Sequence, residues 1–292
     1  MSSPILDDIL SLTQEAVDAT EHLFNTARQH IVDRVTAGGK LDRNKFEAEQ
    51  LATHGLAWMA TYVKALSQMN SWAECQKVKG AFGDKEKLLL QISFGEYCAQ
   101  LYGGIPISQV EIVRPHHLGL TSVETETYFQ GAVKTLIEAN TSQLYMELAM
   151  QIENSLDDGN YGALGLDDEM LVMIREQFHR FSEEQIIPHC HEWHLNDTLI
   201  PMEIINQMAD LGVFGLTIPT EWGGLGMSKI AMCVVTEELA RGYIGVGSLG
   251  TRSEIAAELI RLGGTDSQKE TYLPKIASGE IFPYSPNDVD EI

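Results

Sequence analysis

The sequence predicts an all-α protein in which two helical bundle domains follow one another in tandem. Apolar residues recur at helical spacing through most of its 292 residues. No stretch alternates Val, Ile and Thr with polar residues, which is the pattern expected of a half-buried strand. A segment rich in Asp, Asn and Gly, NSLDDGNYGALGLDD, separates two sets of helical patterns. We therefore place a helical N-terminal extension at residues 1–155 and a linker at residues 156–166.

The first predicted helix begins at Ser3 and Pro4. Serine commonly caps a helix, proline fits the first turn, and the carboxylates of Asp7 and Asp8 suit a helix N-terminus. The apolar spacing then continues until Gly38. Two more helical regions and another long helix are predicted by the same spacing, over residues 46–69, 88–101 and 128–152.

Helical patterns continue beyond the linker. A helix that carries Phe178 and Phe181 is predicted to end at Pro188, because proline interrupts a helix interior. The pair Thr265 and Gln268 forms a capping box and predicts the start of a last helix. Two further helices are predicted between these, over Pro201–Leu211, where Gly212 ends the helix, and over Ile230–Arg241.

Composition restricts the partners and the compartment. The formal net charge of −22 opposes binding to nucleic acid, since a polyanion site needs clustered Lys and Arg. No segment is apolar enough to span a membrane, and no signal peptide precedes the first helix. The four cysteines show no CxxC spacing and are expected to be reduced thiols, which predicts a cytoplasmic protein. They are Cys75, Cys98, Cys190 and Cys233.

Three ordered motifs carry a resemblance to a known family. They are LGVFGLTIPTEWGGLGMS from Leu211, TEELARGYIGVGSLG from Thr236 and GGTDSQKETYLPKIASGE from Gly263. Residues 167–283 are similar through them to the N-terminal helical domain of acyl-CoA dehydrogenases. Each residue also has a structural explanation: Gly223, Gly224 and Gly226 permit positive φ, and Thr265 caps a helix. The resemblance rests on the ordered set.

The resemblance implies an enzyme that is dependent on FAD. In that family the helical domain packs against a β-barrel domain and a C-terminal helical bundle, which hold FAD and the acyl-CoA between them. The implied reaction is α,β-dehydrogenation of an acyl-CoA thioester, in which a glutamate takes the α-proton and the flavin takes the β-hydride. The implied partners are the acyl-CoA substrate, an electron-transfer flavoprotein or similar acceptor, and other copies of the complete enzyme in a homo-oligomer.

The chain is expected to be incomplete, and alone inactive. The resemblance ends at Pro283. Residues 284–292, YSPNDVDEI, form a divergent tail where the family continues into the flavin-contacting barrel. The catalytic glutamate of the family lies further on, in the C-terminal bundle. No catalytic residue is therefore assigned, and Glu237, Glu238 and Glu254 are not promoted to that role. The first two occupy helical positions where solvated glutamates are common.

The resemblance places three residues along the acyl chain of the substrate. They are Val246, Gly247 and Thr251, on the helix that follows Glu238. Small groups at Gly247 and Thr251 leave room for an acyl chain, and they equally suit close packing of two helices. FAD-binding residues are not identified in this sequence.

Two other patterns are interpreted as structural. The segment PHCHEWH contains four residues of metal-ligating type close together in sequence: His189, Cys190, His191 and His194. No second ligand pair of CxxC or HxxxH type accompanies them, so a structural or surface role is favoured over zinc binding. The glycines of RGYIGVG do not match GxGxxG, and no strand precedes them, so a Rossmann site is disfavoured.

The N-terminal extension resembles a helical extension found on a subset of bacterial acyl-CoA dehydrogenases. Two segments carry this second resemblance: HGLAWMATYVKAL, from His54, and FGEYCAQLYGGIPISQ, from Phe94. Docking to the enzyme body or assembly of an oligomer is the expected role. A second hypothesis for the whole chain is a non-enzymatic helical interaction module, against which retained FAD in purified protein would argue.

Overall fold

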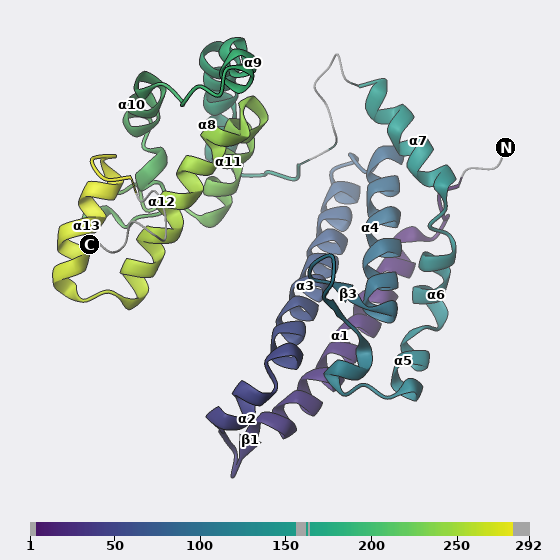
Figure 1. The fold of residues 1–292 in the computed structure, drawn as a ribbon. Coiled ribbons are helices and arrows are strands. Elements are labelled where there is room, and N and C mark those ends of the chain that lie inside the picture. Colours follow the sequence, from purple (N-terminus) through teal and green to yellow (C-terminus); the bar gives the residue numbers. More distant parts are fainter. Residues whose placement is uncertain (1–3, 156–161, 163, 283–292) are drawn as a thin grey trace. The chain divides into compact units, whose positions relative to one another are not determined.

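The computed structural model describes residues 4–155, 162 and 164–282, and it divides into two compact units, Met1–Gly165 and Leu166–Ile292. Helices make up most of both units (Figure 1), so the prediction of an all-α fold is confirmed. Part of the predicted linker (156–161 and 163) and the tail at 284–292 lie outside the described residues. The predicted domain boundaries therefore stay a prediction. Within the described parts of the chain, no helix is both long enough and apolar enough to cross a membrane.

Three long helices, joined by α6 (Gly131–Glu138), form the core of unit 1. The long helices are α1 (Ile9–Val35), α3 (Gln50–Val78) and α4 (Asp84–Gly103). Their apolar stripes face one another, and side chains such as Leu66, Leu90 and Phe94 are completely buried there. Four short helices complete the unit: α2 (Arg43–Ala48), η1 (Pro115–Leu118), α5 (Ser122–Tyr128) and α7 (Ser142–Glu153).

Two short antiparallel hairpins also occur in unit 1. One pairs β1 (Thr36–Ala37) with β2 (Lys40–Leu41), and the other pairs β3 (Ile105–Pro106) with β4 (Ile112–Val113). Strands of two residues need no alternating pattern, so these hairpins were not predicted. The described residues contain no larger sheet.

The first helix begins later than predicted. α1 starts at Ile9, and Pro4 lies in a bend before it, while Ser3 is outside the described residues. The reason is a long-range contact: the buried side chain of Gln91 accepts a hydrogen bond from the Leu6 amide at 2.9 Å and donates to the carbonyl of Pro4 at 3.3 Å. These bonds satisfy backbone groups that a helix would otherwise use.

The predicted long helix over residues 128–152 is also wrong, because the structure has α5, α6 and α7 there. α6 starts at Gly131, whose φ of +54° interrupts a helix. The second break lies at Asn140, whose side-chain amide donates to Glu96 of α4 at 2.7 Å. That tertiary bond anchors the turn between α6 and α7.

The described residues of unit 2 form six helices and a π-turn. They are α8 (Glu169–Phe181), α9 (Ile187–Leu195), α10 (Met202–Asp210), α11 (Lys229–Gly242), α12 (Ile244–Gly263), α13 (Asp266–Ala277) and the π-turn η2 (Ser182–Ile186). Two single turns, η3 (Val213–Gly215) and η4 (Thr220–Trp222), frame the loop before α11. The core is apolar and includes Phe178, Trp193, Met208, Leu239 and Val246.

The prediction that a helix ends at Pro188 is wrong. The chain continues from α8 through the π-turn into α9, where Pro188 lies in the first turn. Proline lacks an amide hydrogen and its ring collides with the carbonyl four residues earlier in a regular α-helix. The wider π-turn lies at that point, so the helical path continues. In contrast, the predicted capping box of Thr265 and Gln268 and the left-handed Gly212 are confirmed.

Candidate functional site

One face of α12 forms a continuous exposed stripe. Four of its large apolar side chains are exposed by 57 to 75%, although α12 lies in a folded unit. Half-buried Ser248 and exposed Arg252 lie between them at the same three- to four-residue spacing. We call this set the α12 stripe: Ile244, Ser248, Arg252, Ile255, Leu259 and Leu262. An apolar surface with one guanidinium at its middle suits a ligand or a protein surface that carries an anion.

Arg252 is the residue that sequence reasoning missed. Among the described residues, no hydrogen bond or ion pair engages its guanidinium. An unpaired arginine on an apolar surface is available to bind a carboxylate with two parallel hydrogen bonds. Its spacing of four residues from Ser248 and three from Ile255 was the available signal, because it puts the cation on the apolar stripe.

The structure places the three predicted acyl-facing residues at different depths of α12. Val246 is completely buried in the core of unit 2. A Cβ atom on Gly247 would lie 2.8 Å from the backbone of Ala240 on α11, so this glycine permits close packing of the two helices. Thr251 is half-buried at the edge of the stripe, and its hydroxyl donates to the carbonyl of Gly247 at 3.4 Å. Of the three, Thr251 lies nearest to the exposed surface.

A set of paired charges flanks the stripe. We call it the α12 carboxylate cluster: Glu254 and Glu258 of α12 with Lys229 and Arg261. The Lys229 ammonium contacts Glu254 and lies 3.1 Å from Glu258, while Arg261 donates to Glu258 through two nitrogens at 2.9 Å. Glu254 also accepts a hydrogen bond from Thr217. The Arg261 hydrogen bonds, offset in part by burial and assisted by Lys229, lower the pKa of Glu258 from 4.5 to about 2.

This lowered pKa predicts an acid-sensitive unit 2. The folded state favours ionised Glu258 more than the unfolded chain does, so its stabilisation is fully present above pH 4.5 and is lost as pH falls toward about 2. We expect the free energy of unfolding of unit 2 to decrease through this window. The Glu258→Gln variant should show a weaker decrease, whereas Glu237→Gln, at an exposed position of α11, should keep the wild-type slope. Urea titrations at several pH values measure these slopes, and identical slopes for Glu258→Gln and wild type would contradict the assignment.

The double-glycine motif forms a loop beside this cluster. Its backbone returns along residues 215–218, with the amides of Leu225, Gly226 and Met227 donating to carbonyls of that segment at 2.8 to 2.9 Å. A groove of about 400 Å³ lies between the loop and the cluster, lined by Thr217, Pro219, Thr220, Gly226, Met227, Lys229, Glu258 and Arg261. Its two cations are already paired with carboxylates, so the groove is no ready anion site.

The expected role of one glycine in this loop is wrong. Gly223 and Gly226 have positive φ, of +81° and +61°, as predicted. Gly224 does not. Instead, a Cβ atom there would lie 2.1 Å from the carbonyl oxygen of Ile218. Gly224 is therefore required by the close approach of two backbone segments.

Glu238 is buried, contrary to the expectation of a solvated side chain. Only 2% of its side chain is exposed, and it lies 3.0 Å from Arg175 of α8 and 3.0 Å from Arg241 of α11. His179 Nδ1 lies 2.9 Å from the same carboxylate, and Arg241 also pairs with Glu183 at 2.8 Å. We call these five residues the Glu238 network. Burial alone would raise the pKa of Glu238, but hydrogen bonds from Arg241 and His179 and the charge of Arg175 lower it. Glu237 is exposed as expected.

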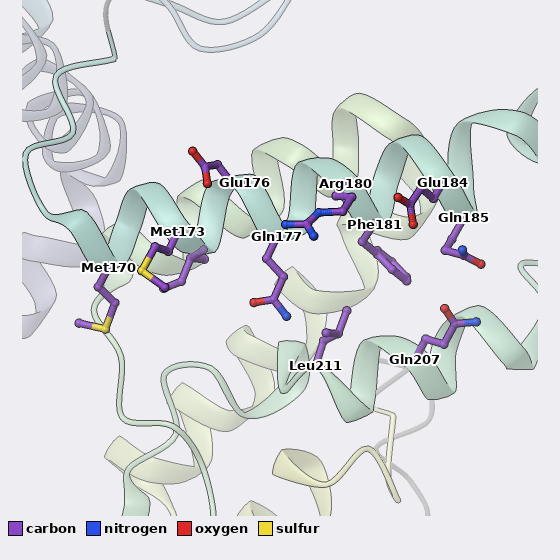
Figure 2. Close-up of a pocket in the computed structure, with 11 residues that line it drawn as sticks. Met170, Met173, Glu176, Gln177, Arg180, Phe181, Glu184, Gln185, Gln207 and Leu211 are labelled. Atoms are coloured by element: carbon purple, nitrogen blue, oxygen red, sulfur yellow. The ribbon is translucent and has the colours of Figure 1, made fainter.

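A separate groove of about 670 Å³ lies between α8 and α10. Figure 2 shows Met170 and Met173 at one end of α8, while Gln207 of α10 and Leu211 lie across from the part of the helical path that follows them. Acidic, basic and amide side chains line it, and Arg180 is the basic one. None of the predicted acyl-facing residues contributes, so this groove is not the predicted site.

The PHCHEWH residues lie on α9. His189 stacks on Trp193 with ring centroids 6.0 Å apart, and the Cys190 thiol donates to the carbonyl of Ile187 at 3.4 Å. In the part of the chain that the structure describes, no group of three or more His, Cys, Asp or Glu side chains is arranged to hold a metal ion. The absence of bound zinc stays a prediction.

Comparisons with known proteins identify similar sequences and structures. Residues 168–280 match the family model of the acyl-CoA dehydrogenase N-terminal domain. The (2S)-methylsuccinyl-CoA dehydrogenase of Cereibacter sphaeroides is 53% identical over 282 residues, which are 96% of this chain and 50% of that protein. The mitochondrial isovaleryl-CoA dehydrogenase of Bos taurus is 33% identical over 138 residues, 46% of this chain and 32% of that protein.

A glutaryl-CoA dehydrogenase crystal structure from Mycobacterium smegmatis aligns over 39% of this chain and 30% of its own, at 28% identity and a TM-score of 0.37. The chain spans about half the length of the first relative and about a third of the second. The match to the Cereibacter sphaeroides protein includes the N-terminal extension as well as the second unit.

Proposed function

The chain belongs to the acyl-CoA dehydrogenase family through residues 168–280, and on that basis we propose that it forms part of an enzyme that oxidises a dicarboxylic acyl-CoA thioester. The observation that carries the substrate class is Arg252. It is the one cation of the α12 stripe and has no partner among the described residues. A relative named for (2S)-methylsuccinyl-CoA, whose acyl group bears a second carboxylate, supports the same class.

The α12 stripe gives one wall of the acyl site in this proposal. Exposed Ile255 and half-buried Thr251 contact the hydrocarbon part of the acyl group, and Arg252 binds its distal carboxylate. Val246 and Gly247 act from inside the unit: the first fills the core beneath the stripe, and the second brings α12 close to α11. The position of the wall thus depends on residues that touch no substrate.

No described carboxylate near the stripe is suited to remove the α-proton. Glu238 is buried, and hydrogen bonds from Arg241 and His179 and the charge of Arg175 lower its pKa. The carboxylates of the α12 cluster are paired with Lys229 and Arg261. A general base needs free access to its proton and a pKa near the working pH. We therefore assign the proton abstraction to a residue outside the described part of the chain.

We infer that the groups that bind FAD lie outside the described residues. Binding the pyrophosphate of FAD requires free cations or exposed backbone amides, and the Glu238 network and the α12 carboxylate cluster already use their cations internally. When bound elsewhere in the protein, FAD would supply the acceptor for the β-hydride. The contribution of this chain is to orient the acyl group and to exclude water from one side.

The remaining partners follow the family. We infer an electron-transfer flavoprotein or similar acceptor for the reduced flavin, a homo-oligomeric enzyme and a cytoplasmic location. The four cysteines are free thiols, which supports a reducing compartment.

A chimaera tests the role of Arg252. Residues 1–282 are joined to the half of the Cereibacter sphaeroides relative that this chain does not cover. Over the half that it does cover, the two sequences are 53% identical. We expect Arg252→Gln to lower kcat/KM for (2S)-methylsuccinyl-CoA by roughly 10- to 100-fold, the effect of removing one charged hydrogen-bond pair. The neutral analogue 2-methylbutyryl-CoA should be turned over at an unchanged rate, and Arg252→Lys should retain part of the activity toward the dicarboxylic thioester. An equal loss for both thioesters would show that Arg252 serves the fold and not the carboxylate.

A further inference from the structure

We propose that Glu238 is a positioning residue: its buried ion pairs fix the start of α12, and with it the α12 stripe. The proposal rests on the function proposed above for that stripe. Among the described residues, the hydrogen bonds and ion pairs of Glu238 reach α8, the π-turn and α11 and none reaches α12, so its effect is transmitted through the turn between α11 and α12. The physical question is how a charge on α11 determines the position of the next helix.

The first step is the attachment of α11 to α8 and the π-turn. Arg175 and His179 of α8 both reach the Glu238 carboxylate, at 3.0 and 2.9 Å. The hydroxyl of Ser182, in the π-turn, donates to the backbone carbonyl of Glu238 at 2.8 Å. The side chain and the backbone of one buried residue therefore hold α11 against its neighbours. Removing one partner of such a buried group leaves a buried charge unpaired, which is destabilising, so these contacts hold α11 firmly.

The second step is the turn itself, where α11 and α12 share one residue. The amide of Tyr243 donates to the carbonyl of Leu239 in α11 at 3.0 Å. The carbonyl of Tyr243 in turn accepts from the amides of Val246 and Gly247, at 2.9 and 3.2 Å, and so begins α12. Any movement of the last turn of α11 is therefore passed directly to the first turn of α12.

The third step is packing at the same place. A Cβ atom on Gly242 would lie 3.1 Å from side-chain atoms of Ser182 and Ile186, so the end of α11 rests directly on the π-turn. The ring of Tyr243 meets the buried Trp193 of α9, with centroids 6.1 Å apart. The π-turn, which Ser182 links to Glu238, thus also supports the turn between α11 and α12.

Hydrogen exchange on the full chain tests this without substrate or cofactor, so it can fail independently of the proposed function. In Glu238→Gln, we expect the amides of Val246 and Gly247 to exchange about tenfold faster than in wild type. Amides of α13 around Leu273, in the same unit, should change much less, and α1 in unit 1 should not change. The matched control Glu237→Gln alters the neighbouring exposed glutamate and should leave all three regions as in wild type.

If Glu238 only stabilised unit 2 as a whole, its replacement would accelerate exchange equally in α12 and α13. That result would overturn the proposal. If Glu238→Gln unfolds the whole unit, the milder Arg241→Gln decides, because Arg175 and His179 still hold the carboxylate. Faster exchange confined to the start of α12 in Arg241→Gln supports the positioning role. Equal acceleration in α13, or no acceleration at Val246 and Gly247, overturns it.

Discussion

Purified residues 1–292 are expected to be colourless and inactive toward acyl-CoA thioesters, whereas the chimaera described above is expected to be yellow and active. In the function proposed above, the chain supplies one wall of the acyl site, and the cations of the Glu238 network and the α12 carboxylate cluster are paired with carboxylates. We expect flavin binding and proton abstraction to depend on groups outside the described residues. The expected difference in turnover is all or none.

The measurement is the flavin absorbance of each purified protein, followed by an assay with an artificial electron acceptor. (2S)-Methylsuccinyl-CoA and 2-methylbutyryl-CoA serve as the two substrates. The exposed apolar side chains of the α12 stripe should also make residues 1–292 associate at high concentration. Bound flavin and turnover from residues 1–292 alone would place the site within this chain. Tight, saturable binding of a protein partner by flavin-free chain would instead favour the helical interaction module.

Replacing Gly224 by alanine should lower the free energy of unfolding of unit 2 by about 3 kcal/mol or more, because the new methyl group meets backbone that cannot move away. The clashing atom is the carbonyl oxygen of Ile218, 2.1 Å from the position of the added Cβ. That carbonyl also accepts the amide of Gly226 at 2.8 Å, so relief of the clash would break the loop.

Gly223 gives a matched control in the adjacent position. Its φ of +81° strains an alanine, but no atom lies within 4 Å of the added Cβ, so Gly223→Ala should cost only about 1 kcal/mol. Urea unfolding followed by tryptophan fluorescence measures both variants. Replacing Trp58 and Trp72 of unit 1 by Phe leaves Trp193 and Trp222 to report on unit 2 alone. Equal losses for the two variants would mean that backbone strain, and not close approach, sets the requirement at Gly224.

Local sequence patterns predicted most of the helices of this protein. The apolar spacing of α1, α3, α4 and α11 reflects burial of one helix face, which the chain encodes residue by residue. Caps such as Thr265 with Gln268 depend on neighbours within one turn and were predicted for the same reason. The family was identified from ordered motifs, and the comparisons confirm it.

Three of the errors involve a contact between residues far apart in sequence. Gln91 holds the segment before α1 out of the helix, and Asn140 breaks the predicted long helix through its bond to Glu96. The continuation of the helical path past Pro188 depends on the π-turn that packs against Gly242. Patterns within a window of a few residues contain no information on such partners.

The sequence by itself determined that this chain is helical, which family it resembles and which helix carries the candidate site, because spacing and motif order are properties of the chain. Only the tertiary structure decided what individual side chains on that helix do. It showed that Gly247 packs against Ala240, that Glu238 is buried among cations, and that Arg252 is exposed. The physical reason is that burial, pairing and pKa depend on the groups that surround a side chain, and folding brings those groups from other helices.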